Sequence, residues 1–188
     1  MVSTREKLLS TALGVFSERG TDGGSMREIA RRAGVNVATA YHHFGSKRDL
    51  FLAIFRELGF VDAPFDVAGL SFEGQAPAQR LETILLGSWV FMTIGADVVR
   101  LAVLETLKGD EEVREVFEEW RRQGDARIEE VLVRAGLATK ANAPQRAWLA
   151  RQVIWGVFVE ALMHGRLDVE HFRDKARTAA ETLVRGGW

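Results

Sequence analysis

Residues 25–51 read SMREIARRAGVNVATAYHHFGSKRDLF, and the helix-capping residues in this stretch decide the fold. Ser25 can cap a first short helix, which Gly34 ends, and Asn36 can cap a second one that ends before Gly45. Two short helices joined by a glycine-containing turn are typical of a helix-turn-helix motif. In such a motif the second helix lies in the major groove of DNA. The stretch therefore predicts a module of short helices that can bind DNA.

The sequence on either side of this motif predicts two further helices. A helix over about residues 4–19 has one apolar face, and Ser3 with Glu6 is a capping-box pattern at its start. Beyond the motif, Ser46 with Asp49 caps another helix. The apolar residues of these two helices are Leu8, Leu9, Ala12, Leu13 and Phe16, then Leu50, Phe51, Ile54 and Phe55.

The remainder of the chain is predicted to be helical as well. Its apolar spacing indicates helices over about residues 80–95, 96–108, 111–135, 145–164 and 169–185. The three prolines lie outside the periodic apolar segments. The chain is therefore predicted to be all-α, with an N-terminal three-helix helix-turn-helix domain followed by a helical bundle.

Two of these helices are unusually apolar, and a third carries a seam of small residues. Residues 145–164 are apolar on nearly all sides, and residues 169–185 carry a seam of small residues. One subunit can hardly bury both, so together they predict a homodimer interface, with burial inside a single subunit as the alternative. Residues 96–108 are nearly all apolar and are expected to be central and buried.

Residues 59–79 differ from the helices around them. They contain glycine and proline and have little helical period, so they are the candidate linker. Their apolar residues are Phe60, Val61, Phe65, Val67, Leu70 and Phe72. Because such side chains need apolar partners, a packed connection or a lid over the body is expected rather than a free tether.

Composition and charge exclude several classes of protein. Of 188 residues, 47% are hydrophobic and 27% charged, which excludes a disordered tail protein. The absence of cysteine excludes a disulfide framework, thiol catalysis and cysteine-ligated zinc. A charged N-terminus and the lack of a run of about 18 apolar residues predict a soluble, cytoplasmic protein with no membrane contact. Residues 1–50 carry a net charge of +3 and residues 51–188 carry −4, so the basic part of the chain contains the helix-turn-helix.

The stretch quoted above closely resembles the signature of the tetracycline-repressor (TetR) family of transcriptional regulators. The likeness covers roughly residues 4–58. The matching residues are Ile29, Ala30, Ala33, Gly34, Val35, Thr39, Tyr41, His43, Phe44, Ser46, Lys47 and Leu50. The chain departs from the family pattern at Thr21, Gly24, Asn36 and Ala40. The resemblance implies a DNA-binding domain over residues 1–55 and an effector-binding and dimerisation domain over residues 56–188.

The resemblance also implies which residues contact double-stranded DNA. The side chains that it puts on the groove-facing side are Val37, Ala38, Thr39, Tyr41 and His42. The methyl groups of Val37, Ala38 and Thr39 can meet thymine methyls, and Thr39 and His42 can hydrogen-bond base edges. The residues placed for phosphates are Tyr41, His43, Arg27 and Lys47. Because so few cations are available to contact phosphates, two DNA-binding domains are expected to be needed for useful affinity. A two-fold dimer that carries them predicts a palindromic operator.

An apolar effector site is expected between the helices of the body. Its expected lining is Trp89, Phe91, Met92, Arg100, Leu104, Trp120 and Trp155. For each aromatic residue, packing in the core is the alternative. Arg100 and Glu105 lie in the most apolar helix, so they are expected to pair or to meet a polar group of a ligand. The effector is therefore predicted to be apolar or aromatic, with at most one polar anchor.

The sequence offers little for catalysis or for metal binding. His42 and His43 could hold a metal, but neighbours on a helix point about 100° apart and no third ligand is near. Glu160 and His164 are expected to interact on a helix face rather than to relay protons. Without a GxSxG, an HExxH or a phosphate-cradling glycine loop, no enzyme activity, cofactor or metal is predicted.

These patterns together predict a homodimeric, ligand-responsive transcriptional regulator, a repressor that an effector releases from DNA. Two alternatives stay open. One is an effector-insensitive DNA-binding adaptor whose body only dimerises, which a filled interior would favour. The other is a helical small-molecule binding protein or enzyme whose N-terminal DNA-binding domain is vestigial. Failure of the protein to bind DNA sequence-specifically would favour it.

Overall fold

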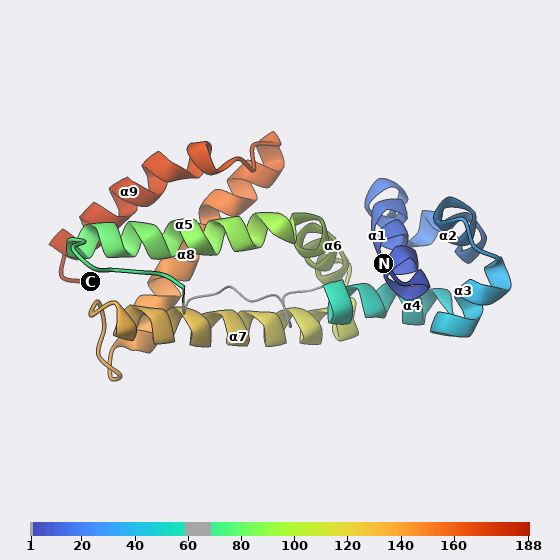
Figure 1. The fold of residues 1–188 in the computed structure, drawn as a ribbon, viewed down its shortest axis with the longest axis horizontal. Helices are drawn as coiled ribbons and strands as arrows, with labels where there is room; N and C mark the ends of the chain where they lie inside the picture. The colour runs from blue at the N-terminus through green and yellow to red at the C-terminus, as the bar shows by residue number, and fades with distance from the viewer. Residues whose placement is uncertain (1, 59–68) are drawn as a thin grey trace. The chain divides into compact units, whose positions relative to one another are not determined.

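The computed structural model describes residues 2–58 and 69–188, and every regular element in that part of the chain is helical (Figure 1). In chain order the elements are α1 (Thr4–Gly23), α2 (Met26–Ala33), α3 (Val37–Phe44), α4 (Lys47–Ala53), the π-helix η1 (Ile54–Leu58), α5 (Pro77–Ile94), α6 (Ala96–Leu107), α7 (Glu111–Arg134), α8 (Ala143–His164) and α9 (Val169–Arg185). The predicted all-α fold is confirmed.

Helix α1 begins where the sequence predicts and is interrupted next to its predicted end. At its start the Glu6 amide donates to Ser3 Oγ (3.1 Å) and the Ser3 amide donates to Glu6 Oε2 (2.9 Å), which completes the predicted capping box. Gly20 adopts φ +70° and ψ 170°, a non-helical conformation open to glycine, so the regular helix stops near residue 19 as predicted. A short helical segment that the sequence did not predict follows the kink and continues to Gly23.

Packing against α1 explains the glycine at position 24. A Cβ atom on Gly24 would lie 2.8 Å from two ring carbons of Phe16 and 3.2 Å from Val15 Cγ1. Carbon atoms at van der Waals contact are about 3.5–4.0 Å apart, so a larger residue here would clash with α1. The short turn between α1 and α2 therefore needs glycine, which accounts for one departure from the TetR pattern.

The described residues form two compact units. The first contains residues 2–58 and 95–120, which are α1 to α4, η1, α6 and the first part of α7. The second contains residues 69–94 and 121–188, which are α5, the rest of α7, α8 and α9. Helix α6 belongs to the first unit because it packs against α1 and η1. The predicted functional division between residues 55 and 56 does not coincide with these units and stays a prediction.

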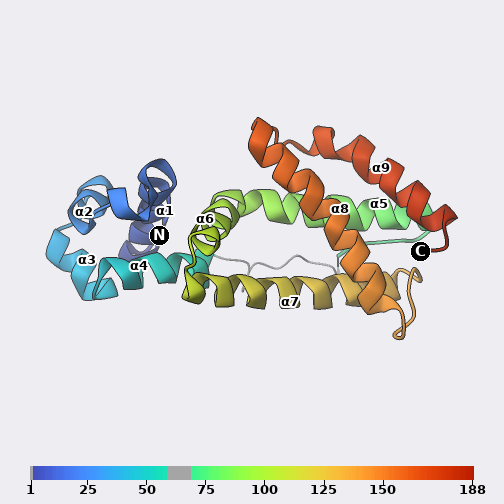
Figure 2. The ribbon, with the colours of Figure 1, turned by 180° about the vertical axis from the view of Figure 1, so that it is seen from behind.

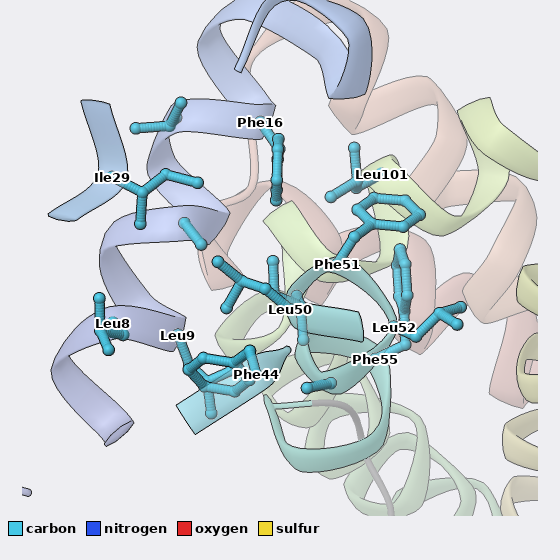
Figure 3. Close-up of a cluster of buried hydrophobic side chains, with 14 of the residues drawn as sticks. Leu8, Leu9, Phe16, Ile29, Phe44, Leu50, Phe51, Leu52, Phe55 and Leu101 are labelled. Atoms are coloured by element: carbon cyan, nitrogen blue, oxygen red, sulfur yellow. The ribbon is translucent and has the colours of Figure 1, made fainter. Parts of the chain in front are cut away.

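The first unit is held together by a hydrophobic cluster to which most of its helices contribute (Figure 3). Aromatic contacts run through this cluster from α1 to α7. The ring centroids lie 5.5 Å apart between Phe16 and Phe51, 4.9 Å between Phe51 and Phe55, and 6.0 Å between Phe55 and Trp120. Such edge-on and tilted pairs stabilise a fold beyond the area that they bury.

Helix α6 is buried along one face only. Val98, Leu101 and Ala102 lie in the hydrophobic cluster of the first unit. Leu104 and Leu107 are exposed. The expected burial of residues 96–108 therefore holds for one face of the helix and not for the face that carries Leu104 and Leu107.

The second unit is built around helix α5. Figure 2 shows α9 beside α5 and α8 crossing α5. Trp89 of α5 is fully buried, stacks on Phe172 of α9 with ring centroids 4.3 Å apart, and meets Phe158 of α8 at 6.0 Å. One aromatic side chain thus joins all three helices.

The predicted linker is described only in part. Phe60, Val61, Phe65 and Val67 lie outside the described residues. Leu70 and Phe72 are half-buried, and the Arg134 guanidinium lies 5.9 Å from the centre of the Phe72 ring. Among the described helices no single one is both long and apolar enough to cross a membrane; α5 and α6 reach the required hydropathy only when taken together.

Candidate nucleic-acid interface

Helix α3 is attached to the first unit by one face. Ala40 is fully buried and Phe44 is 6% exposed, and these two residues are one helical turn apart. The Asn36 side chain caps the N-terminus by accepting from the Ala38 amide (2.8 Å), as the sequence predicts. At the other end the Gly45 amide donates to the Tyr41 carbonyl (2.7 Å).

The opposite face of α3 is open to solvent. Ala38, Tyr41, His42 and His43 are exposed, and Tyr41 has 49% of its surface accessible. Val37 and Thr39, the other predicted base-contacting residues, are half-buried. The His42 and His43 rings lie 5.9 Å apart. All the predicted recognition residues thus keep accessible surface, which a base-reading helix requires.

The two cations predicted to meet phosphates differ in their surroundings. Arg27 is exposed on α2. Lys47 is half-buried, and its ammonium donates to the carbonyl of Thr21 at the end of α1 (3.0 Å). An ammonium has three N–H donors, so this bond leaves two of them for a phosphate.

Two further cations, Arg31 of α2 and Lys7 of α1, lie on the same helices of the first unit and were not predicted from the sequence. Arg31 is exposed on α2 one turn after Arg27, so the (i, i+4) spacing of the two residues was a usable signal. The exposed Lys7 of α1 has its Nζ 3.7 Å from the place where a Cβ of Gly34 would lie, beside the turn between α2 and α3. No local pattern connects Lys7 with that turn, because the two are far apart in sequence.

Ion pairs fix α2 on α1. Arg32 pairs with Glu18 (2.8 Å) and with Glu28 (3.0 Å), and Arg19 also pairs with Glu28 (2.8 Å). The hydrogen bond to Glu18 raises the pKa of Arg32. These exposed pairs each stabilise the module little, but together they define how α2 lies against α1.

A second set of ion pairs fixes the start of α4. The Arg48 guanidinium bonds Asp110 (Nη2 to Oδ1, 2.8 Å) and Glu112 (Nη2 to Oε2, 2.7 Å) at the start of α7. Asp110 Oδ1 also accepts from the Val113 amide (3.2 Å). The bond from Arg48 lowers the pKa of Asp110, and the same bond raises that of Arg48.

A cavity of about 280 Å³ lies next to these pairs within the first unit. Its lining residues are Phe16, Thr21, Asp22, Lys47, Arg48, Phe51, Glu105 and Asp110. The buried Glu105 accepts from Lys108 (2.7 Å) and, more weakly, from the Thr21 hydroxyl (3.4 Å). Arg100 is half-exposed and pairs with Asp97 (3.8 Å). Arg100 and Glu105 are thus both paired, as expected, Arg100 with Asp97 and Glu105 with Lys108.

The predicted effector-lining residues do not gather at one described cavity. Arg100, Leu104 and Trp120 belong to the first unit, whereas Trp89, Phe91, Met92 and Trp155 belong to the second. Trp89 and Trp120 are buried in the cores of their units, and Leu104 is exposed. Neither the cavity just described nor the groove between α8 and α9 described next has any of the seven in its lining. The effector site therefore stays a prediction.

The second unit has an open groove between α8 and α9. Its volume is about 700 Å³, and its lining residues are Gln152, Val153, Gly156, Val157, Glu160, Asp174, Lys175, Thr178, Ala179, Thr182 and Leu183. On α8, the apolar side chains of Trp148, Val159 and Met163 are also exposed. The predicted interface helices thus leave apolar surface accessible in a single subunit.

Glu160 and His164 interact along α8, as predicted, through the backbone of Glu160: His164 Nδ1 lies 2.8 Å from the Glu160 carbonyl oxygen. The Glu160 carboxylate pairs with Lys175 of α9 (2.6 Å), and this hydrogen bond lowers the pKa of Glu160, with smaller contributions from His171 and His164. Over residues 2–58 and 69–188, no three His, Asp, Glu or Cys side chains are arranged to hold a metal ion.

Comparison with known proteins supports the resemblance. Residues 8–54 match the family model of bacterial regulatory proteins, tetR family. The HTH-type transcriptional regulator BetI of Rhizobium meliloti (strain 1021) is 48% identical over 54 residues, which are 29% of this chain and 27% of that protein. The HTH-type transcriptional repressor NicS of Pseudomonas putida is 30% identical over 106 residues, 55% of this chain and 49% of that protein. The chain thus spans less than half the length of these two curated relatives.

Solved structures match nearly the whole chain. One from Mesorhizobium loti MAFF303099, assigned to the TetR family of transcriptional regulators, has a TM-score of 0.79 at 21% identity and covers 97% of this chain and 96% of that one. A TetR transcription regulator from Haloarcula marismortui ATCC 43049 has a TM-score of 0.71 at 20% identity and covers 95% of each chain. At such identities the likeness shows the fold alone.

Proposed function

Because residues 8–54 belong to the tetR family of bacterial regulatory proteins, we propose that this chain is a transcriptional repressor that binds DNA through α3. The observation that carries the proposal is the two-sided character of α3, which is anchored by Ala40 and Phe44 while Ala38, Tyr41, His42 and His43 stay exposed. An eight-residue helix presented in this way matches the recognition helix of a helix-turn-helix. The proposal assigns no catalytic residue and no cofactor, and it places the protein in the cytoplasm with its DNA.

The side chains on α3 define the proposed mode of reading. The methyl groups of Val37, Ala38 and Thr39 suit thymine methyls, and the imidazole of His42 suits a base-edge acceptor or donor. Arg27 and Lys47, with the phenol of Tyr41 and the imidazole of His43, bind phosphates and so orient the helix without reading sequence. The α3 sequence contains no arginine that could clamp guanine.

The proposed assembly is a homodimer formed through α8 and α9. Its support is the open groove between these helices together with exposed Trp148, Val159 and Met163 on α8. Burial of this surface by a second copy gives two recognition helices related by a two-fold axis. A palindromic operator with half-sites about one DNA turn apart, roughly 34–36 Å or a multiple of it, then follows.

The proposed regulation is release from DNA by a small, mostly apolar effector bound within residues 56–188. An effector that prefers a conformation unfit for the operator shifts the population away from the DNA-binding state. The coupling is reciprocal, so operator DNA weakens effector binding by the same factor.

Selection of bound fragments from a random-sequence DNA pool tests DNA binding. The wild-type protein is expected to enrich a palindromic sequence. His42→Ala is expected to lower affinity for the enriched duplex by about 5–150-fold, because one good base contact discriminates by about 1–3 kcal/mol. Affinity for an unrelated duplex of the same length should not change. Enrichment of no sequence by the wild-type protein would refute the proposal.

One observation favours a second candidate, a DNA-binding regulator whose body serves only to dimerise. Trp89, a predicted effector-lining residue, is fully buried against Phe172 and Phe158 and so acts as a core residue. A thermal-shift screen with apolar and aromatic compounds separates the two candidates. A compound that raises the melting temperature and also releases the enriched duplex supports the effector-responsive repressor; release by none of a broad panel supports the second candidate.

A further inference from the structure

Arg5, in the first turn of α1, contacts the end of the proposed recognition helix. Its guanidinium carbon lies 4.4 Å from the centre of the Phe44 ring, and Phe44 is the last residue of α3. The Nη2 atom of the same guanidinium pairs with Glu57 Oε1 of η1. One side chain therefore joins α1, α3 and η1, three elements of the first unit.

The contact between the Arg5 guanidinium and the Phe44 ring is largely shielded from solvent. Phe44 is only 6% exposed. Arg5 Nη1 is buried and has no hydrogen-bond partner among the described residues, although the Arg5 side chain as a whole is 40% exposed. The electron-rich face of Phe44 is then what compensates that nitrogen for its lost hydration. A cation–π contact of this kind depends on the charge of Arg5 and on the angle of the ring.

Phe44 is the largest side chain by which α3 packs into the core of the first unit. Ala40, the other buried residue of the helix, contributes only a methyl group, and Val37 packs against the same cluster while half-buried. Tyr41, His42 and His43 directly precede Phe44 in the same helix, so a rotation of the helix about its axis that displaces the Phe44 ring also turns these three side chains. Figure 3 shows Phe44 among the buried side chains of the unit, where its ring is held in place.

We infer that Arg5 is a positioning residue for DNA recognition: by holding the Phe44 ring from α1 and pairing with Glu57, it sets the orientation in which α3 presents His42 to the bases and Tyr41 and His43 to the phosphates. This inference rests on the proposed function. The side chains of a recognition helix need to lie within about 0.5 Å of the geometry in which they contact DNA. A single rigid contact at the end of the helix can fix that placement.

A direct contact between Arg5 and a DNA phosphate is the competing explanation, and the two differ in measurable ways. Loss of a phosphate contact weakens binding to all sequences alike and reduces the slope of affinity against salt concentration by about one. Loss of a positioning contact weakens binding to the specific sequence and leaves both the non-specific affinity and the salt slope unchanged.

The test compares Arg5→Met, Arg5→Lys and Phe44→Leu with wild type on two labelled duplexes, at several salt concentrations. One duplex is the sequence that the wild type enriches from a random pool, and the other is unrelated and of the same length. Arg5→Met is expected to weaken binding to the enriched duplex by about tenfold, or about 1.4 kcal/mol, with no change on the other. Arg5→Lys, which keeps a cation over the ring, is expected to restore most of the affinity, and Phe44→Leu to reproduce the loss. Arg114→Met, which removes an exposed arginine from an ion pair within α7, is the matched control and should bind as wild type does.

The outcomes distinguish the inference from the function on which it rests. Failure of the wild type to enrich any sequence refutes the proposed function. Normal enrichment by the wild type with equal affinity of Arg5→Met overturns the inference alone, as does an equal loss on both duplexes with a reduced salt slope. Circular dichroism verifies that each variant is folded. If Arg5→Met does not fold, Glu57→Gln removes the anchoring charge instead; it is expected to lower specific affinity in the same way, and wild-type affinity in that variant overturns the inference.

Discussion

Replacement of Asp110 by asparagine is predicted to destabilise the first unit by about 1–2 kcal/mol. The Asp110 side chain is 15% exposed, and its two oxygens accept from Arg48 while Oδ1 also accepts from the Val113 amide. Asparagine keeps Oδ1 but places an N–H where Oδ2 accepts, so one charge-assisted bond is lost. Such a bond contributes about 1.5–3 kcal/mol, and the value is smaller here because Arg48 is 44% exposed and keeps its pair with Glu112.

The loss should depend on pH in a defined direction. The hydrogen bond from Arg48 holds the pKa of Asp110 below its ordinary value. Because folding lowers this pKa, the stabilisation is fully present above the unfolded-state pKa of about 3.9 and is lost as the pH falls through the lowered, folded-state pKa. The difference in stability between wild type and Asp110→Asn is therefore expected to be constant from about pH 7 to pH 5 and to shrink below about pH 4.

Urea unfolding followed by far-UV circular dichroism measures this difference at each pH. Glu111→Gln is the matched control, because Glu111 is an exposed acid one position further along that pairs with Arg114 within α7. Its effect is expected to stay within about 0.5 kcal/mol. The reasoning is refuted if Asp110→Asn is no more destabilising than Glu111→Gln, or if its effect at pH 3.5 is as large as at pH 7.

Three further predictions concern packing and assembly. Gly24→Ala should destabilise the fold by about 1–3 kcal/mol because its Cβ would meet the Phe16 ring, whereas Gly14→Ala, with open space around the new methyl group, should be neutral or stabilise by about 0.5–1 kcal/mol; thermal melts of both variants measure this. Phe172→Ala should lower the free energy of unfolding by about 3–5 kcal/mol, since it removes the ring stacked on Trp89, and a loss under 1 kcal/mol in urea titrations would count against a filled core. Val157→Asp in the groove between α8 and α9 should sediment as a folded monomer where the wild type sediments as a dimer; a dimeric variant, or a monomeric wild type, contradicts the proposed interface.

Local chemistry made much of the fold predictable. Ser3, Ser25, Asn36 and Ser46 cap helices in the structure because side-chain oxygens next to a helix start satisfy amides that have no other partner. The local signals also marked Gly20, where a positive φ interrupts the helix, but they did not show that a further helical turn follows before Gly24. The interruption was thus predictable, and the short continuation to Gly23 was not.

Long-range packing could not be predicted in the same way. The apolar pattern of residues 96–108 indicates a buried face but not its partner, and the structure pairs that face with α1 and η1. Trp89 and Trp120 were open to assignment as pocket lining or as core, because an aromatic stripe has the same spacing in both cases. The contact of Arg5 with Phe44 joins two residues that are far apart in the sequence, and no local sequence pattern indicates it.

The shortness of the side chains at the start of α3 has a consequence for redesign of specificity. Ala38 is exposed and contributes a methyl group, while its backbone amide is already fixed by the Asn36 cap. A longer residue at this position can be added without removing any packing from the unit. In the proposed mode of DNA reading, position 38 is therefore the place to change specificity, because an added arginine or glutamine there would lie on the face of α3 proposed to meet guanine or adenine, with the rest of the unit unaltered.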